Sequence, residues 1–252
     1  IDFTWSWVAA LESDGKTMQP FDFGTTDAYN WYLEQTDLAT LDEQHLGHKV
    51  PSWQNFVEHP NYDSYWNGSL TSQVMPQKVA VPNLIVAGWY DQEDFYGPLE
   101  IYKNQEKGDD ESLNYLVVGP WNHGGWRGEG LEYGPFNLGS ATGDYFRSKA
   151  ELPWFQYWLK GEGKLEQPEA LVFQTGSNKW QKLNSWPAKE NVVTRNLYLR
   201  AGGKLSFEPP QRGEATAATF VSDPANPVPY RPKTELKPFL TEGSTWRTWQ
   251  AD

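Results

Sequence analysis

The chain has 252 residues, of which 21% are charged and 38% hydrophobic, and this composition is typical of a folded globular protein. Its net charge of −12 argues against a nucleic-acid partner, because phosphate binding needs clustered lysines and arginines. The chain has no cysteine, which excludes disulfides, thiolate catalysis and cysteine-based zinc sites, and no apolar run approaches the roughly 20 residues of a membrane span.

Residues 1 to about 78 show no alternation of apolar and polar side chains, and we expect them to be helical and irregular. Asp27 is placed to cap a short helix over residues 29–33. A second helix is predicted over residues 50–57, and the following HPNYD segment, residues 59–63, ends it. We interpret this part as an α-rich insertion or lid.

The pattern changes at residue 79. Residues 79–88 form a short apolar run that ends in glycine, which is typical of a strand buried on both faces. A helix-like stretch around residues 95–102 follows, and then residues 113–120 repeat the strand pattern. A helix is predicted over residues 145–160, with Pro153 as an early interruption and a stop at the following glycine. This alternation of strands and helices predicts a parallel sheet.

The remaining sequence is predicted to be β-rich. Residues 171–174 are a candidate strand, and residues 196–207 have the pattern of a hairpin with a glycine-containing turn at 201–204. Proline and glycine are frequent after residue 209. We therefore expect residues 190–252 to begin an all-β module, which at this length is too short for a complete sandwich.

Two residues capable of catalysis follow the two predicted parallel strands. Asp91 ends the segment GWYD (88–91), and His123 ends GPWNH (119–123). Because the carboxyl ends of parallel strands lie at one edge of a sheet, Asp91 and His123 can meet there, and this pairing matches the last two members of the order Ser, Asp, His in α/β-hydrolases. Alternatively, Asp91 caps the next helix and His123 is an ordinary loop residue.

The nucleophile of such a triad is missing from the sequence. No Gly-x-Ser-x-Gly pentapeptide occurs, and the similar segment GSATG (139–143) has the wrong spacing and follows no apolar strand, so we interpret it as a loop. We therefore expect the nucleophile upstream of Ile1. The absence of an initiator methionine there is typical of a processed or truncated product.

Other residues near the predicted strand ends have two interpretations each. Trp89, Tyr90 and Trp121 are candidates to line a substrate pocket, although packing beneath the loops would also explain the tryptophans. Glu93 and Asp94 are expected in the first turn of the next helix, where the helix dipole favours acidic residues. The histidines in the first part of the chain show no metal-binding spacing, so we predict neither a metal nor a cofactor.

At these motifs the sequence resembles the cocaine esterase / X-Pro dipeptidyl-peptidase family of serine hydrolases. Within it, the sequence is most similar to the α-amino acid ester hydrolases and the glutaryl-7-aminocephalosporanic acid acylase-like proteins. Five segments in the family's order carry the resemblance: HPNYDSYW (59–66), GWYDQED (88–94), GPWNHGG (119–125), YWLKG (157–161) and VSDPANPVP (221–229).

The resemblance implies an α/β fold in which this chain holds the second half of an α/β-hydrolase fold with a helical cap, followed by the start of a jelly-roll β-sandwich. Residues 1–78 would be part of the cap, 79–189 the C-terminal half of the hydrolase domain, and 190–252 the truncated start of the jelly roll. It also implies that Asp91 orients His123, which activates the upstream serine.

The α-amino acid ester hydrolases carry an acidic cluster that holds the ammonium group of the substrate, and the resemblance makes Asp63 a candidate member of it. The neighbouring position, acidic in those enzymes, is Ser64 here, so the cluster is incomplete by this alignment. A helix-capping role explains Asp63 equally well.

The resulting functional hypothesis is a serine hydrolase that cleaves small-molecule esters or amides through an acyl-enzyme, with α-amino acid esters, β-lactam acyl side chains or X-Pro peptides as substrates. Alone, the chain is expected to be inactive, because its partner is the upstream portion of the same protein that carries the serine. A carbohydrate- or surface-binding module and an acyltransferase with the same triad are the alternatives. We expect no nucleic-acid or membrane partner and favour a periplasmic or secreted protein, and the sequence leaves a homo-oligomer open.

Overall fold

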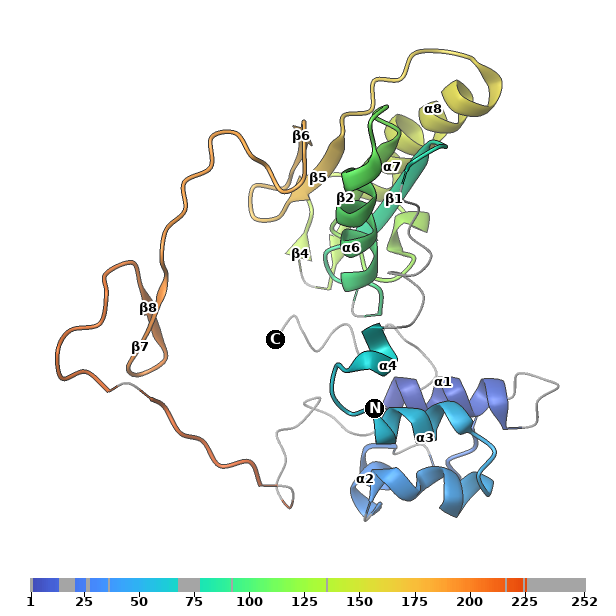
Figure 1. The fold of residues 1–252 in the computed structure, drawn as a ribbon, viewed down its shortest axis with the longest axis vertical. Coiled ribbons are helices and arrows are strands. Elements are labelled where there is room, and N and C mark those ends of the chain that lie inside the picture. Colours follow the sequence, from blue (N-terminus) through green and yellow to red (C-terminus); the bar gives the residue numbers. More distant parts are fainter. Residues whose placement is uncertain are drawn as a thin grey trace.

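The computed structural model describes residues 2–13, 21–25, 28–35, 37–67, 78–91, 93–134, 136–215, 217–223 and 225. In Figure 1, the helices before residue 68 gather at one end of the molecule, and a small sheet with its covering helices lies at the other. A β-hairpin formed by later residues stands away from that sheet. No helix of the described residues is long and apolar enough to cross a membrane.

The first part of the chain is helical, as predicted. Its helices are α1 (Asp2–Glu12), α2 (Ala28–Glu34), α3 (Pro51–Glu58) and α4 (Ser64–Asn67), and short 3-10 and π-helical turns lie at Leu38–Thr40 and Asp42–Leu46. Helix α3 begins at a proline, which lacks the N–H that the first turn leaves unpaired anyway. The predicted cap of α2, Asp27, lies outside the described residues.

This helical part has its own apolar core. Trp5 of α1 and Trp53 of α3 are buried and pack edge to face, with ring centroids 5.1 Å apart. Leu41 and Val50 complete the centre of the cluster, and the buried carboxylate of Asp42 accepts hydrogen bonds from the backbone N–H groups of residues 49 and 50. Aromatic packing therefore holds these short helices together.

The second part is a four-stranded sheet in the order β1-β2-β5-β6, with β1 (Asn83–Gly88), β2 (Asn114–Gly119), β5 (Ala170–Gln174) and β6 (Lys179–Leu183). Strands β1 and β2 are parallel, as predicted; the candidate strand at 171–174 is β5, which adds parallel to β2, and β6 adds antiparallel to β5. Every residue of β2 is buried, which explains its uninterrupted apolar sequence. Strand β6 lacks the apolar run that would have predicted it, because its residues KWQKL are partly charged, as is usual in an edge strand.

Helices cover both faces of this sheet (Figure 1). On one face, Tyr102 of α6 (Tyr96–Gln105) packs against Leu116 and Val118 of β2. On the other face, Phe146 and Ala150 pack against alternate residues of β2 and β5. Each fully buried Leu or Val side chain contributes about 1.5–3 kcal/mol, so this two-sided burial is the main stabilisation of the sheet.

The helix predicted over residues 145–160 is confirmed and is longer at its start. It runs through α7 (Thr142–Phe146), a π-helical segment (Arg147–Glu151), α8 (Leu152–Phe155) and a second π-helical segment (Gln156–Lys160). Pro153 does not interrupt it, because it occupies the first turn of α8, directly after the π-helical segment. Gly161 ends the run with a φ of 69°.

The remaining short strands are β3 (Glu132–Tyr133), β4 (Phe136–Asn137), β7 (Tyr198–Arg200) and β8 (Lys204–Ser206). The predicted hairpin is confirmed as β7–β8, in which Tyr198 pairs with Ser206. The hairpin exposes apolar side chains, among them Leu199 at 84%. The jelly roll expected over residues 190–252 stays a prediction, because residues 226–252, with most of the VSDPANPVP motif, lie outside the described residues.

Candidate active site

The carboxyl ends of β1 and β2 are joined residue by residue. Gly88 pairs with Gly119 at the end of the parallel register, and the backbone N–H groups of Trp89 and Tyr90 donate to the carbonyl oxygens of Gly119 and Trp121, both at 2.9 Å. The pairing therefore continues beyond the strands themselves. It carries the two loops that follow β1 and β2 to the same place at the edge of the sheet.

Asp91 and His123 meet at this edge. The Nδ1 atom of His123 lies 3.0 Å from Oδ2 of Asp91, at hydrogen-bonding distance. The other oxygen of Asp91 accepts the backbone N–H groups of Glu93 and Asp94, each at 3.0 Å, which fixes the carboxylate. The side chain of Asp91 is 3% exposed and that of His123 is 41% exposed. A buried carboxylate thus orients a partly exposed imidazole through Nδ1.

Two further carboxylates surround the imidazole of His123. Oδ2 of Asp94 lies 3.6 Å from Nδ1, and Oε2 of Glu93 lies 3.9 Å from Nε2. Glu93 is therefore on the side of the ring that Asp91 leaves free. The carboxylates of Asp91, Glu93 and Asp94 together form a compact negative site that can attract a positively charged group.

The interpretation of Glu93 and Asp94 as first-turn helix residues is wrong. Helix α6 begins at Tyr96, and both residues belong to the turn that precedes it. Asp91 accepts their backbone N–H groups, and the resulting turn directs their side chains toward His123. The sequence signal for this was an Asp followed at positions two and three by acidic residues in a loop.

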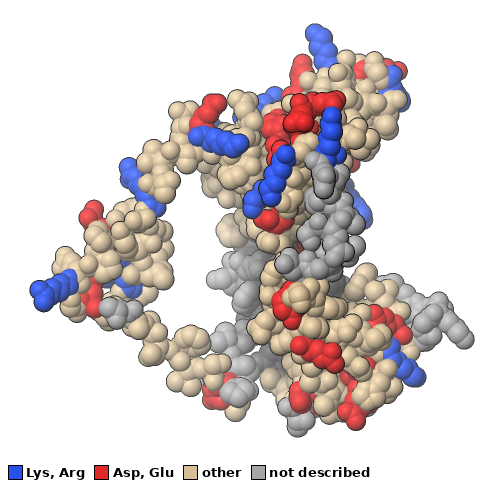
Figure 2. Space-filling model, viewed as in Figure 1, with Lys and Arg blue, Asp and Glu red and all other residues tan. Residues whose placement is uncertain are grey.

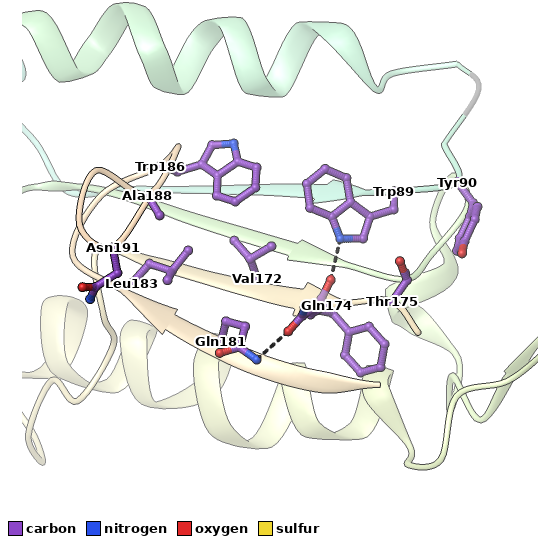
Figure 3. A pocket seen from close by; sticks show the side chains of 11 residues that line it. Trp89, Tyr90, Val172, Gln174, Thr175, Gln181, Leu183, Trp186, Ala188 and Asn191 are labelled. Atoms are coloured by element: carbon purple, nitrogen blue, oxygen red, sulfur yellow. Dashed lines mark hydrogen bonds between the residues drawn. The ribbon is translucent and has the colours of Figure 1, made fainter. Parts of the chain in front are cut away.

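Two of the predicted pocket residues line a cavity. Trp89 and Tyr90 stand at one end of a cavity of about 820 Å³ on the α6 side of β5 and β6 (Figure 3). The Trp89 indole donates to the carbonyl oxygen of Phe173 at 2.7 Å, and its ring packs against Trp186. Tyr90 stacks on Tyr133 with centroids 4.4 Å apart.

Trp121 and Asp63 occupy other environments. Trp121 is only 2% exposed and packs in the core against Phe146, so its side chain presents no surface to a ligand. Asp63 lies at the start of α4, where it contacts Nδ1 of His59 at 2.6 Å and accepts the backbone N–H of Tyr65 at 2.9 Å. The hydrogen bond with His59 is the main cause of the lowered pKa of Asp63. Among the described residues, no hydrogen bond or ion pair joins Asp63 to Asp91 or His123.

A second group of acidic residues lies at the opposite, amino end of the sheet. Tyr102 donates its hydroxyl to Glu169 at 2.9 Å, and Asn114 donates its amide to Glu106 at 2.7 Å. The pKa of Glu169 is raised to about 7, chiefly by burial; the nearby carboxylates of Glu106 and Asp109 also raise it, and the hydrogen bond from Tyr102 opposes them. Burial and the same Glu169 carboxyl also raise the pKa of Tyr102.

The charge of the protein is unevenly distributed. Residues 1–67 hold eleven Asp or Glu residues and two Lys, so most of the net charge of −12 comes from the helical part. In Figure 2, acidic side chains lie across that end of the molecule, with few basic ones among them. Within the described residues, no group of three or more His, Asp or Glu side chains is arranged to hold a metal ion.

The fold and this edge define the class: an α/β protein with a parallel sheet and an Asp–His pair after two adjacent strands. Residues 3–125 match the X-Pro dipeptidyl-peptidase (S15) family. The cocaine esterase of Rhodococcus sp. (strain MB1 Bresler) is 29% identical over 205 residues, which are 76% of this chain and 34% of that protein. Both matches agree with the family that the sequence motifs indicated.

Solved structures agree with this result. The structure of an aminopeptidase from a marine sediment archaeon, Thaumarchaeota archaeon, has a TM-score of 0.84 and 32% identity, and the match covers 97% of this chain and 40% of that one. The structure of an α-amino acid ester hydrolase has a TM-score of 0.80 and 32% identity, over 92% of this chain and 39% of that one. The chain thus spans about two fifths or less of the length of these relatives.

Proposed function

We propose that the parent protein hydrolyses ester or amide bonds with a serine triad in which Asp91 and His123 are the second and third members. The observation that carries this proposal is the 3.0 Å contact between Nδ1 of His123 and Oδ2 of Asp91 at the ends of adjacent parallel strands. With a proton on Nδ1 donated to Asp91, the Nε2 atom keeps its lone pair and can accept a proton from a hydroxyl. Asp91 then stabilises the imidazolium that forms.

The serine itself comes from a portion of the parent protein outside these 252 residues. The sequence holds no Gly-x-Ser-x-Gly elbow, and GSATG (139–143) lacks its spacing and follows only β4, a two-residue antiparallel strand. An acyl-enzyme forms when the serine attacks the substrate carbonyl and the leaving group departs with the proton from His123. Water then repeats the transfer and releases the acid.

We further propose that the substrate carries a free amino group close to the bond that is cleaved. Glu93 supports this, because its carboxylate lies 3.9 Å from Nε2 and can hold an ammonium group beside the reacting carbonyl. Asp94, 3.6 Å from Nδ1, adds a second negative charge to the same site. Two relatives, an aminopeptidase and an α-amino acid ester hydrolase, bear names that imply such substrates. Asp63, which the family resemblance made a candidate to bind the ammonium group, instead has its carboxylate in contact with the ring of His59.

The proposal is tested with the full-length protein on nitrophenyl esters of an α-amino acid and of its des-amino analogue. His123→Ala should lower kcat by about 10³-fold or more, because the serine then lacks its base. Lys149→Met, a substitution at an exposed residue, is the control and should keep the wild-type kcat. Near-normal kcat of His123→Ala would refute the triad, and equal turnover by residues 1–252 alone would refute the external serine.

A further inference from the structure

The loop that carries His123 is held by the helical run that follows it. The contact begins with Thr142, the fully buried first residue of α7. Its Oγ1 accepts the indole N–H of Trp121 at 3.0 Å and donates to the carbonyl oxygen of Gly130 at 2.8 Å. The backbone N–H of Thr142 donates to the same carbonyl at 3.0 Å. One side chain thus ties together the two ends of the loop, residues 121 and 130.

Arg147 holds the middle of the same loop. Its Nη1 donates to the carbonyl oxygens of Trp126 and Gly128 at 2.6 Å and 2.7 Å, and its Nη2 pairs with Asp144, which orients the guanidinium. The ring of Trp126 lies edge-on to that of His123, with centroids 6.4 Å apart. A planar guanidinium has several donors in fixed directions and can bind two neighbouring carbonyls at once. The ammonium group of lysine lacks this fixed geometry.

The backbones of the loop and of α7 are also in direct contact. The N–H of Gly143 donates to the carbonyl of Glu129 at 3.0 Å, and a Cβ at Gly143 would lie 2.1 Å from the carbonyl oxygen of Gly128. His123 is therefore two residues after one fixed point, Trp121, and three before another, Trp126. Movement of the imidazole relative to Asp91 requires some of these contacts to break.

We propose that Thr142 and Arg147 are positioning residues that hold His123 in register with Asp91 and with the incoming serine. This inference rests on the proposed function, since it assigns the two residues a role in the same proton transfer. The GSATG segment lacks the spacing of a nucleophile elbow. Under this inference it nevertheless supports the site, because its Thr142 holds the loop that carries His123. Misplacement of a reacting group by about 1 Å can cost about 100-fold in rate.

The experiment uses the full-length protein and variants matched in shape. Thr142→Val removes the hydroxyl and keeps the branched side chain, whereas Thr142→Ser keeps the hydroxyl. Arg147→Met removes the donors, and Arg147→Lys keeps only the charge. Lys149→Met, on the same helical run but exposed, is the control. Melting temperature and the fraction of active sites, titrated to completion with a fluorophosphonate, separate folding from positioning.

Thr142→Val and Arg147→Met should lower kcat per titrated site by about 10- to 100-fold, with KM changed by less than about twofold. The acid limb of the pH–kcat/KM profile should shift, because the His123–Asp91 hydrogen bond is altered. Thr142→Ser should restore both values, and Arg147→Lys should restore kcat only in part. A normal kcat per titrated site and an unchanged pH profile in Thr142→Val and Arg147→Met, even with a lowered melting temperature, would overturn the inference.

The two proposals can fail separately. If His123→Ala abolishes activity while Thr142→Val and Arg147→Met remain normal per titrated site, the triad stands and the positioning role is overturned. If His123→Ala retains near-normal activity, the triad fails, and the positioning role fails with it.

Discussion

Gly88 and Gly119 face each other as the last pair of β1 and β2, and Trp121 fills the space that a side chain at either position would need. A Cβ at Gly88 would lie 2.2 Å from the carbonyl oxygen of Trp121, and one at Gly119 would lie 2.4 Å from its indole ring. This close approach lets the backbone of Tyr90 bond to Trp121. It thereby sets the separation of the loops that carry Asp91 and His123.

Gly88→Ala should therefore impair both folding and activity. The added methyl group must push the Trp121 carbonyl away, at a cost of about 1–3 kcal/mol in unfolding free energy, and the displaced loops should lower kcat by at least about tenfold. Gly97→Ala is the control, because a Cβ there meets nothing within 4 Å and alanine favours the helix. Chemical denaturation and ester hydrolysis by the full-length protein measure the two effects. Wild-type values for Gly88→Ala would contradict the assigned role of the glycine pair.

Asp91→Asn should retain the fold and lose most of the activity. The amide can still accept the backbone N–H groups of Glu93 and Asp94, but its NH₂ group would donate to Nδ1 of His123 and shift the proton to Nε2. An Nε2 that carries a proton cannot act as the base, so kcat should fall about 10⁴-fold. The exposed Asp110→Asn serves as control. A loss smaller than about tenfold in steady-state kinetics would exclude Asp91 from the triad.

Glu93→Gln and Asp94→Asn should reduce the preference for substrates with an amino group. A charge-assisted hydrogen bond is worth about 1.5–3 kcal/mol, so kcat/KM for an α-amino ester should fall about 10- to 100-fold in Glu93→Gln. The fall should be smaller in Asp94→Asn, because the Asp94 carboxylate lies on the Nδ1 side of the ring. The des-amino ester should be unaffected or hydrolysed slightly better. The exposed Glu132→Gln controls for net charge. Equal losses on both esters would indicate that the carboxylates act on His123 rather than on the substrate.

The parts of this site that were predictable depend on sequence periodicity. The apolar runs before Gly88 and Gly119 predicted adjacent parallel strands, and their carboxyl ends predicted that Asp91 and His123 would meet. The orientation of Glu93 depends on a turn closed by one oxygen of Asp91, and a periodic apolar pattern does not predict such a turn. The clamp formed by Thr142 and Arg147 depends on contacts over 12 to 21 residues, which require the folded backbone.

The burial of Trp121 illustrates the same limit. A tryptophan next to a predicted catalytic histidine has the same sequence context whether it lines a pocket or packs in the core. The structure decides between these possibilities, because Phe146 of the following helix covers the ring and Thr142 takes its N–H. Trp89, directly after β1, lines the cavity instead, where its ring packs against Trp186 and its N–H donates to the carbonyl oxygen of Phe173 (Figure 3).

Glu169 should make the stability of the protein depend on pH. Its pKa is about 7 in the folded protein against an ordinary value of 4.5, chiefly because of burial. Below pH 4.5, the group is protonated in both the folded and unfolded states. As the pH rises from 4.5 to 7, the unfolded chain loses this proton first, so the contribution of Glu169 to the free energy of unfolding falls. Above the folded pKa, the contribution should change no further.

Glu169→Gln should therefore remove part of this pH dependence. The amide stays neutral and can still accept the Tyr102 hydroxyl, so the variant should lose less stability than the wild type between about pH 5 and pH 7.5. Melting temperatures of the full-length protein in buffers of constant ionic strength measure the difference. The exposed Glu162→Gln should follow the wild-type curve. If Glu169→Gln also followed that curve across the whole range, Glu169 would titrate at the same pH in the folded and unfolded chains, and the buried acidic group would not govern stability.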